Sequence, residues 1–185
     1  MASSTEICNL ALSLLGQEPI VTMDDATKSS RLCIRFYDQT LDYLLRSHSW
    51  TFAIRRVSLA AEQETPAFGF AFQYKLPQDC RRVVELNIPD GHYCIERNRV
   101  LTDYTDVQLR YVQSVLDPND MDAVFIDMFA TELASRLCLP ITADGGLYKF
   151  LRQRTIEIAA EARYTDSIET AAPKIIDGPW LPSRS

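Results

Sequence analysis

The chain has two histidines, His48 and His92, that could take part in acid–base chemistry. His92 lies two positions before Cys94 in an expected strand, where alternate side chains share a face, so a Cys–His nucleophilic pair is conceivable. The sequence offers no third group to orient that pair. His48 is expected at a helix end, where an imidazolium would interact favourably with the helix dipole. A structural role is therefore the favoured interpretation of both histidines, and no catalytic residue is nominated.

Oxygen-bearing side chains gather near residue 120, at Asp117, Asn119, Asp120 and Asp122, and such groups can coordinate calcium. The cluster lacks the glycine and the final glutamate of an EF-hand loop. Asp117 followed by Pro118 is instead typical of a helix start, with the aspartate as N-cap. The sequence also lacks nucleotide-binding and hydrolase motifs. We therefore expect no metal site, no cofactor and no enzymatic activity.

Two arginine pairs and one aromatic run could contact a nucleic acid. The pairs, Arg55–Arg56 and Arg81–Arg82, could bind phosphate, but solvated sheet edges or ion-pair partners are the simpler interpretation. Aromatic residues alternate along an expected strand at Phe68, Phe70, Phe72 and Tyr74. They could stack on the bases of a single strand, although a sheet face packed on the helices is favoured. A single-stranded nucleic-acid-binding module is thus an alternative function.

The element that must position these residues is a long helix over residues 26–50. Its apolar side chains recur at spacings of three and four, which places them on one face: Leu32, Cys33, Phe36, Tyr37, Leu41, Leu44 and Leu45. Asp24 or Asp25 is predicted to cap its start, and Trp50 marks a change to extended chain. A stripe of this length needs neighbouring helices to cover it.

Three further helices are predicted. The first begins with a capping box at Ser3 and Glu6 and ends before Gly16. The next carries an apolar stripe and is predicted to stop at Pro140; the stripe is Met121, Phe125, Met128, Phe129, Leu133 and Leu137. The last runs over residues 147–165, with Leu147, Leu151, Ile158 and Ala162 on its core side. Phe150 lies beside that stripe, and charged residues are expected opposite.

Short strands are predicted between the helical halves, at residues 68–74, 83–88, 93–96, 99–101 and 107–112. The fold class is α+β and mainly α, an antiparallel helical bundle with a small inserted antiparallel β region. A main domain of residues 1–166 would contain the bundle (1–50 and 117–166) and the β region (51–116). Residues 167–185 would form an extended C-terminal arm.

Composition narrows the class of protein. Of 185 residues 46% are hydrophobic, which is enough for a core, and the net charge of −6 does not suggest a nucleic-acid binder. The five cysteines include no C-x-x-C pair and are interpreted as reduced core residues. No apolar run is long enough to span a bilayer, so no membrane contact is expected.

The arm is the feature that is hardest to explain within one copy. Three prolines interrupt it, yet it is too apolar for an idle linker. Ile175, Ile176, Trp180 and Leu181 are therefore predicted to bind a partner surface, and tryptophan is a common interface anchor.

Several short motifs occur in the order found in the phage head-to-tail adaptor family called tail tubular protein A, and the chain resembles that family from residue 7 to about 169. The motifs are LLGQEP (14–19), SWTFA (49–53), YKLPQDCRRV (74–83), LRYV (109–112), DP (117–118) and LPIT (139–142). The family has no catalytic signature, so the resemblance carries over no catalytic residue.

The resemblance implies a structural virion protein, made in the host cytoplasm and located in the phage neck. It implies a homo-oligomeric ring of about twelve copies that docks beneath the portal protein. The ring would extend the channel through which double-stranded DNA is packaged and ejected, without sequence-specific binding. It would also provide a platform for the tail nozzle or next tail component. A tail-associated hydrolase is a further alternative, for which the sequence nominates no carboxylate pair.

Overall fold

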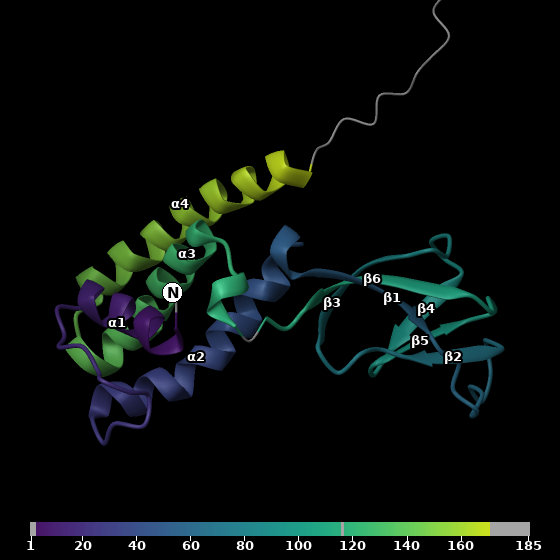
Figure 1. Cartoon of the computed structure of the whole chain (residues 1–185), viewed down its shortest axis with the longest axis horizontal. Coiled ribbons are helices and arrows are strands. Elements are labelled where there is room, and N and C mark those ends of the chain that lie inside the picture. The colour runs from purple at the N-terminus through teal and green to yellow at the C-terminus, as the bar shows by residue number, and fades with distance from the viewer. Residues whose placement is uncertain (1–2, 116, 171–185) are drawn as a thin grey trace, which may run out of the picture.

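The computed structural model describes residues 3–115 and 117–170 of the chain. These residues form a mixed α and β structure with four α-helices and two antiparallel sheets of three strands each. The helices are α1 (Ser4–Leu14), α2 (Lys28–Ser47), α3 (Ala123–Thr142) and α4 (Gly145–Thr170), with short 3-10 helices η1 (Thr51–Ala53) and η2 (Pro118–Asp120). The strands are β1 (Ile54–Leu59), β2 (Phe72–Lys75), β3 (Cys80–Leu86), β4 (Tyr93–Glu96), β5 (Arg99–Thr102) and β6 (Val107–Gln113). Figure 1 shows the helices at one end of an elongated molecule and the sheets at the other.

The ends of α1 confirm the prediction from the sequence. The Ser3 hydroxyl accepts a hydrogen bond from the Glu6 backbone N–H at 3.1 Å. Gly16 follows the helix in a left-handed conformation, with φ of 65°.

The predicted cap of α2 was wrong. Thr27 is the N-cap, and its hydroxyl accepts a hydrogen bond from the Ser30 backbone N–H. Asp25 is engaged elsewhere, because its carboxylate accepts hydrogen bonds from the backbone N–H groups of Val21 and Thr22. The helix also ends at Ser47, earlier than expected.

Pro140 does not end α3, contrary to the prediction. The helix continues to Thr142 and closes at Ala143, which is left-handed and donates its N–H to the Leu139 carbonyl at 3.1 Å. Proline removes a single N–H donor here, within the last turn, so the cost is smaller than in a helix centre. The Lys28 ammonium donates to the Pro140 carbonyl at 2.7 Å and so satisfies one of the terminal acceptors.

Helix α4 is longer than predicted at both ends. It begins at Gly145, where the Asp144 carboxylate accepts hydrogen bonds from the Gly146 and Leu147 N–H groups at 2.7 and 3.0 Å. It continues to Thr170, so residues 167–170 of the predicted arm are helical. Residues 171–185 lie outside the described part of the chain.

Helix α3 lies at the centre of the helical end because α1, α2 and α4 all pack against it. The six residues of its predicted stripe are all buried, which confirms that part of the prediction. Glu132 is buried there as well, and its carboxylate binds Arg136 at 3.0 Å and Arg152 of α4 at 2.8 Å. Both arginines are partly exposed, so this ion-pair network links α3 and α4 at their common surface.

The β region contains two sheets with the strand orders β1-β6-β3 and β2-β5-β4, and every pairing is antiparallel. The sheets share a core of their own, formed by Tyr74, Leu76, Leu86, Ile88, Val100, Val107, Leu109 and Tyr111. The expectation that the aromatic strand packs on the helices was therefore wrong. The predicted strand 68–74 is also too long, since Phe68 and Phe70 precede β2 and Phe68 is 89% exposed.

Residues of β3 and β6 join the two ends of the molecule. Val112 of β6 and Val115 just beyond it are buried in the helical core. Arg81 of β3 pairs with Asp42 of α2 at 2.7 Å, and Arg82 donates to the Arg46 carbonyl at 3.2 Å. In the described part of the chain, no helix is long and apolar enough to cross a membrane.

Candidate functional site

His48 lies at the end of α2, as predicted, and has a partner that the sequence did not reveal. Its Nε2 lies 2.9 Å from Asp166 Oδ2 of α4, and its ring meets the edge of Trp50 with the ring centroids 4.8 Å apart. The Asp166 carboxylate also accepts a hydrogen bond from the Thr51 backbone N–H at 2.7 Å. These contacts fasten α4 to the end of α2 and the start of η1.

The structure does not pair His92 with Cys94. The His92 ring lies edge-on to Tyr104, with centroids 6.1 Å apart, whereas the Cys94 sulfur lies 3.7 Å from a Glu96 carboxylate oxygen. The geometry therefore gives no support for a Cys–His nucleophilic pair at these positions.

The acidic cluster near residue 120 caps two successive helices. Asp117 accepts a hydrogen bond from the Asn119 backbone N–H at 2.9 Å and starts η2, while Asp122 accepts from the Val124 N–H at 2.8 Å and starts α3. The interpretation of the cluster as helix-start acids is confirmed, but Asp117 caps only the short η2, and the helix that carries the apolar stripe begins at Ala123 with Asp122 as its cap. The described residues contain no group of three or more histidine, cysteine or acidic side chains placed to hold a metal ion.

Three of the four paired arginines contact polar groups of the same chain. Arg81 and Arg82 bind α2 as described above, and Arg55 lies 3.6 Å from an Asp79 carboxylate oxygen. Of the aromatic run, Tyr74 is fully buried and donates its hydroxyl to the Tyr104 carbonyl at 2.8 Å. Tyr74 therefore has no free face on which a base could stack.

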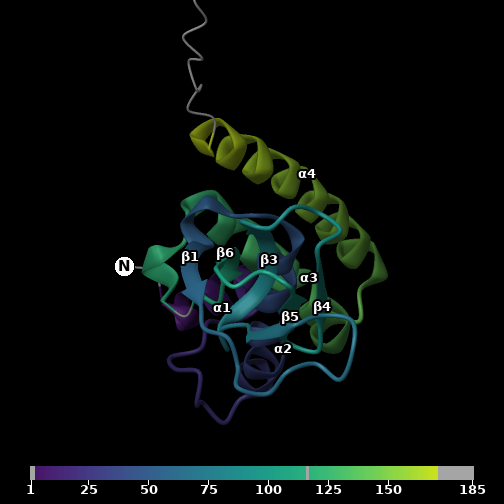
Figure 2. The same cartoon turned by 90° about the vertical axis from the view of Figure 1, so that its right-hand side faces the viewer.

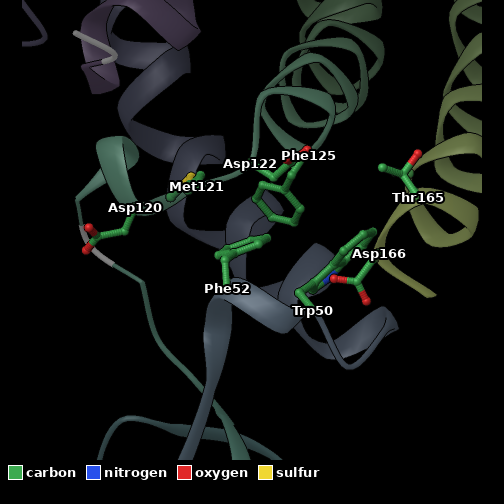
Figure 3. A pocket seen from close by; sticks show the side chains of 9 residues that line it. Trp50, Phe52, Asp120, Met121, Asp122, Phe125, Thr165 and Asp166 are labelled. Atoms are coloured by element: carbon green, nitrogen blue, oxygen red, sulfur yellow. The ribbon is translucent and has the colours of Figure 1, made fainter. Parts of the chain in front are cut away.

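The strongest candidate site is a hollow in the helical end where η1, the segment leading into α3, and α4 meet, called here the junction pocket. It has a volume of about 180 Å³ and nine lining residues, which are Trp50, Phe52, Asp120, Met121, Asp122, Phe125, Ala162, Thr165 and Asp166. Three separate segments meet at it: residues 50–52, residues 120–125 and the C-terminal part of α4. Figure 3 shows Phe52 and Phe125 close together, Asp166 reaching from α4 to lie beside Trp50, and Thr165 set apart on α4.

Aromatic contacts hold the walls of the junction pocket. The ring centroid of Phe125 lies 5.1 Å from that of Trp50 and 4.9 Å from that of Phe52, both edge-on. The Trp50 indole N–H donates to the Leu44 carbonyl at 2.8 Å, which fixes the ring against α2. The lining also includes three carboxylates and, among its described residues, no lysine or arginine. Two of these carboxylates are already engaged within the chain, since Asp122 accepts from the Val124 N–H and Asp166 from the Thr51 N–H.

A second candidate is a surface on α4, called here the α4 outer face. It consists of Phe150, Ile156, Tyr164 and Ile168, whose exposed fractions lie between 58% and 68%. At about 100° per residue Ile156 and Tyr164 lie about 140° around the helix from the centre of the core face of Leu151, Ile158 and Ala162, whereas Phe150 and Ile168 lie about 100° from it, on one flank. Figures 1 and 2 both show α4 at the periphery of the molecule.

The sequence prediction missed the α4 outer face because it expected charged residues there and ended the helix at residue 165. The signal was present, since Phe150 and Tyr164 are about four turns apart and Ile168 follows one turn later. The four residues predicted to bind a partner, Ile175, Ile176, Trp180 and Leu181, lie outside the described residues.

Comparison of the chain with protein-family models gives no match, and comparison with curated proteins gives none either. The junction pocket and the α4 outer face are therefore the features from which a function can be inferred.

Proposed function

We propose that the chain is a structural head-to-tail adaptor of a phage particle. About twelve copies would form a ring that docks beneath the portal protein, extends the channel for double-stranded DNA and offers a platform for the tail. In each copy the helices would form an antiparallel bundle with the β region inserted in it. The protein would act by assembly, without catalytic turnover or a cofactor.

The observation that carries the proposal is the α4 outer face. Four large apolar side chains along one helix are exposed in a single copy, whereas scattered exposed apolar residues would need no explanation. The core-facing side of the same helix is already buried, so the helix has no second way to hide them. A neighbouring copy in a ring would cover this face, and the repetition of one such contact around an axis closes a ring.

The separation of the two ends fits an adaptor that meets one partner at each end. Helices occupy one end and sheets the other, and each end has its own buried core (Figure 1). The order of the motifs shared with the tail tubular protein A family supports the same assignment. We assign the helices to the ring wall, the strands to the face that meets the tail, and residues 175, 176, 180 and 181 to binding of the portal or a neighbouring copy.

The charge of the chain is compatible with a DNA channel. Each copy carries a net charge of −6, and a wall rich in carboxylates would let DNA pass without holding its phosphates. Arg81 already pairs with a carboxylate within the chain, and Arg55 lies near one. These carboxylates reduce the electrostatic attraction of both arginines to DNA phosphates. A channel lined mainly by Arg35, Arg55, Arg56, Arg81 and Arg82 would contradict this part of the proposal.

Mass photometry of the full chain, alone and mixed with a portal ring, tests the proposal. We expect the mixture to contain a complex heavier than the portal by about twelve copies of 21.0 kDa. The double variant Phe150→Ser/Ile156→Ser should assemble poorly, because it removes half of the α4 outer face. A matched control, Val21→Ser/Phe68→Ser, changes two exposed apolar residues outside α4 and should assemble normally.

Two results would contradict the proposal. The unmodified chain could remain a single copy in the presence of the portal, which would remove the adaptor assignment. Alternatively, the α4 double variant could assemble as well as its control, which would show that α4 does not form the contact between copies.

A further inference from the structure

Strand β1 lies at the outer edge of its sheet and has backbone groups without partners. It pairs with β6 alone, in an unbroken antiparallel register from Ile54 to Leu59 (Figure 2). Every second residue of such a strand directs its N–H and C=O groups away from the neighbouring strand. Within the described part of the chain, nothing forms a hydrogen bond to these outward groups of β1. Residues 55–58 are exposed, so the edge is open to another strand.

Natural proteins usually protect an open edge, and β1 lacks most of the usual devices. Proline and β-bulges, which would prevent pairing, are absent from the six residues of β1. Protection comes only from the charges of Arg55 and Arg56, and such charges act selectively. They repel a second copy of β1, because that copy would bring the same arginines close, but they attract a strand with acidic side chains.

A row of charged side chains crosses the sheet and ends at Arg56. Arg56 lies directly opposite Arg110 of β6, which lies opposite Glu85 of β3, so the three side chains share one face. Arg110 donates a hydrogen bond to the Glu85 carboxylate at 3.2 Å. Arg56 has no ion pair with a described residue, and its cross-strand neighbour has the same charge, which is unfavourable. A carboxylate on a strand added beyond β1 would complete the row.

A hollow around this row leaves room for the side chains of such a strand. Its volume is about 350 Å³, and its lining includes Arg56, Ser58, Glu85, Gln108 and Arg110. Two arginines outnumber one glutamate there, whereas the whole chain has a net charge of −6. Positive charge is therefore concentrated beside the open edge of a chain that is acidic overall.

We propose that the free edge of β1 binds an extended acidic segment of another protein, which adds a fourth strand to the β1-β6-β3 sheet. Backbone hydrogen bonds to β1 hold the segment, and a glutamate or aspartate opposite Arg56 gives selectivity. The contact goes beyond the adaptor proposal and does not depend on it, since it requires neither a portal nor a ring.

Titration of the full chain with a ten-residue peptide, followed by amide chemical shifts in NMR spectra, tests this contact. The peptide has glutamate at every second position and valine between, so its glutamates share one face of a strand. The shifts should be largest at residues 54–59 and should saturate with a dissociation constant of about 1 mM or below. The same peptide with lysine in place of glutamate should bind at least about fivefold more weakly, because repulsion replaces attraction at Arg56.

Charge reversal in the protein tests the role of Arg56. Arg56→Glu should reverse the preference, so that the lysine peptide binds more tightly than the glutamate peptide. Its control, Arg35→Glu, makes the same change of charge at an exposed position of α2 and should keep the original preference. A glutamate peptide methylated at every backbone nitrogen keeps its charges but cannot donate backbone hydrogen bonds, and it should not bind β1.

Three results would overturn the proposal. Absence of shifts at residues 54–59 with the glutamate peptide would show that the edge accepts no added strand. Equal binding of the methylated peptide would show that charge alone makes the contact. Shifts at residues 54–59 that appear when the chain is concentrated without peptide would show that a second copy occupies the edge.

Discussion

Phe129 and Phe150 provide a matched pair for testing where the helical core lies. Both are phenylalanines on neighbouring helices, but Phe129 of α3 is 0% exposed and Phe150 of α4 is 64% exposed. The Phe129 ring lies 4.9 Å from that of Tyr37 and 6.4 Å from that of Phe125, measured between centroids. Phe129→Ala should therefore leave a cavity and lower the free energy of unfolding by about 3–5 kcal/mol. Phe150→Ala should change it by no more than about 0.5 kcal/mol.

Urea unfolding followed by the helical circular dichroism signal measures both variants. For a slope of about 2 kcal/mol/M, the loss at Phe129 corresponds to a midpoint lowered by about 2 M. The experiment is run at a concentration where the chain is a single copy, so that any contact between copies at Phe150 does not contribute. If the two variants unfold within about 1 kcal/mol of each other, the assignment of α3 as the central helix is refuted.

Two further predictions concern the connections at helix ends. Asp166→Ala removes the acceptor for the Thr51 N–H and the partner of His48. The free energy of unfolding, measured by urea unfolding, should fall by about 1–3 kcal/mol. Amide exchange at residues 51–53 should become faster. Hydrogen bonds from the Asn119 backbone and side-chain N–H groups lower the pKa of Asp117 below its ordinary value of 3.8. The ionised Asp117 carboxylate therefore contributes to the free energy of unfolding above pH 3.8, and this contribution is lost as the pH falls below that value. The difference in urea midpoint between the unmodified chain and Asp117→Ala should accordingly shrink between pH 6 and pH 3; a constant difference would contradict this.

The parts of the fold that depend on local sequence could be predicted. The N-cap at Ser3 and the stripe of α3 follow from the spacing of a few neighbouring residues, and both were confirmed. Pro140 was misjudged because the penalty for proline depends on how many helical turns follow it. Asp25 was misjudged because a carboxylate that can cap a helix can also close the turn before it.

The β region was harder to predict because its strands are stabilised by residues distant in sequence. Phe68 and Tyr74 look alike in an alternating pattern, but only Tyr74 pairs with another strand, opposite Val100 of β5. Strand β1 was expected only as extended chain, and its partner β6 lies about fifty residues later. The junction pocket could not be predicted for the same reason, since its walls come from three segments that only the tertiary fold brings together.

In helix α4 the pattern of apolar residues combines a core-facing set with an exposed set. Leu151, Ile158 and Ala162 face the core, while Phe150 and Ile168 lie on the flank of that face and Tyr164 lies further round towards solvent, so the apolar residues are spread around the helix. A helix with apolar residues spread over more than one face has a weak one-sided pattern, and it can be mistaken for a poorly defined surface helix. In a protein that functions as one copy, the outer positions would be free to become charged, and solubility would favour that change. Apolar residues at these positions are best explained by a covering surface, and the assembly of the Phe150→Ser/Ile156→Ser variant with the portal tests whether a neighbouring copy provides it.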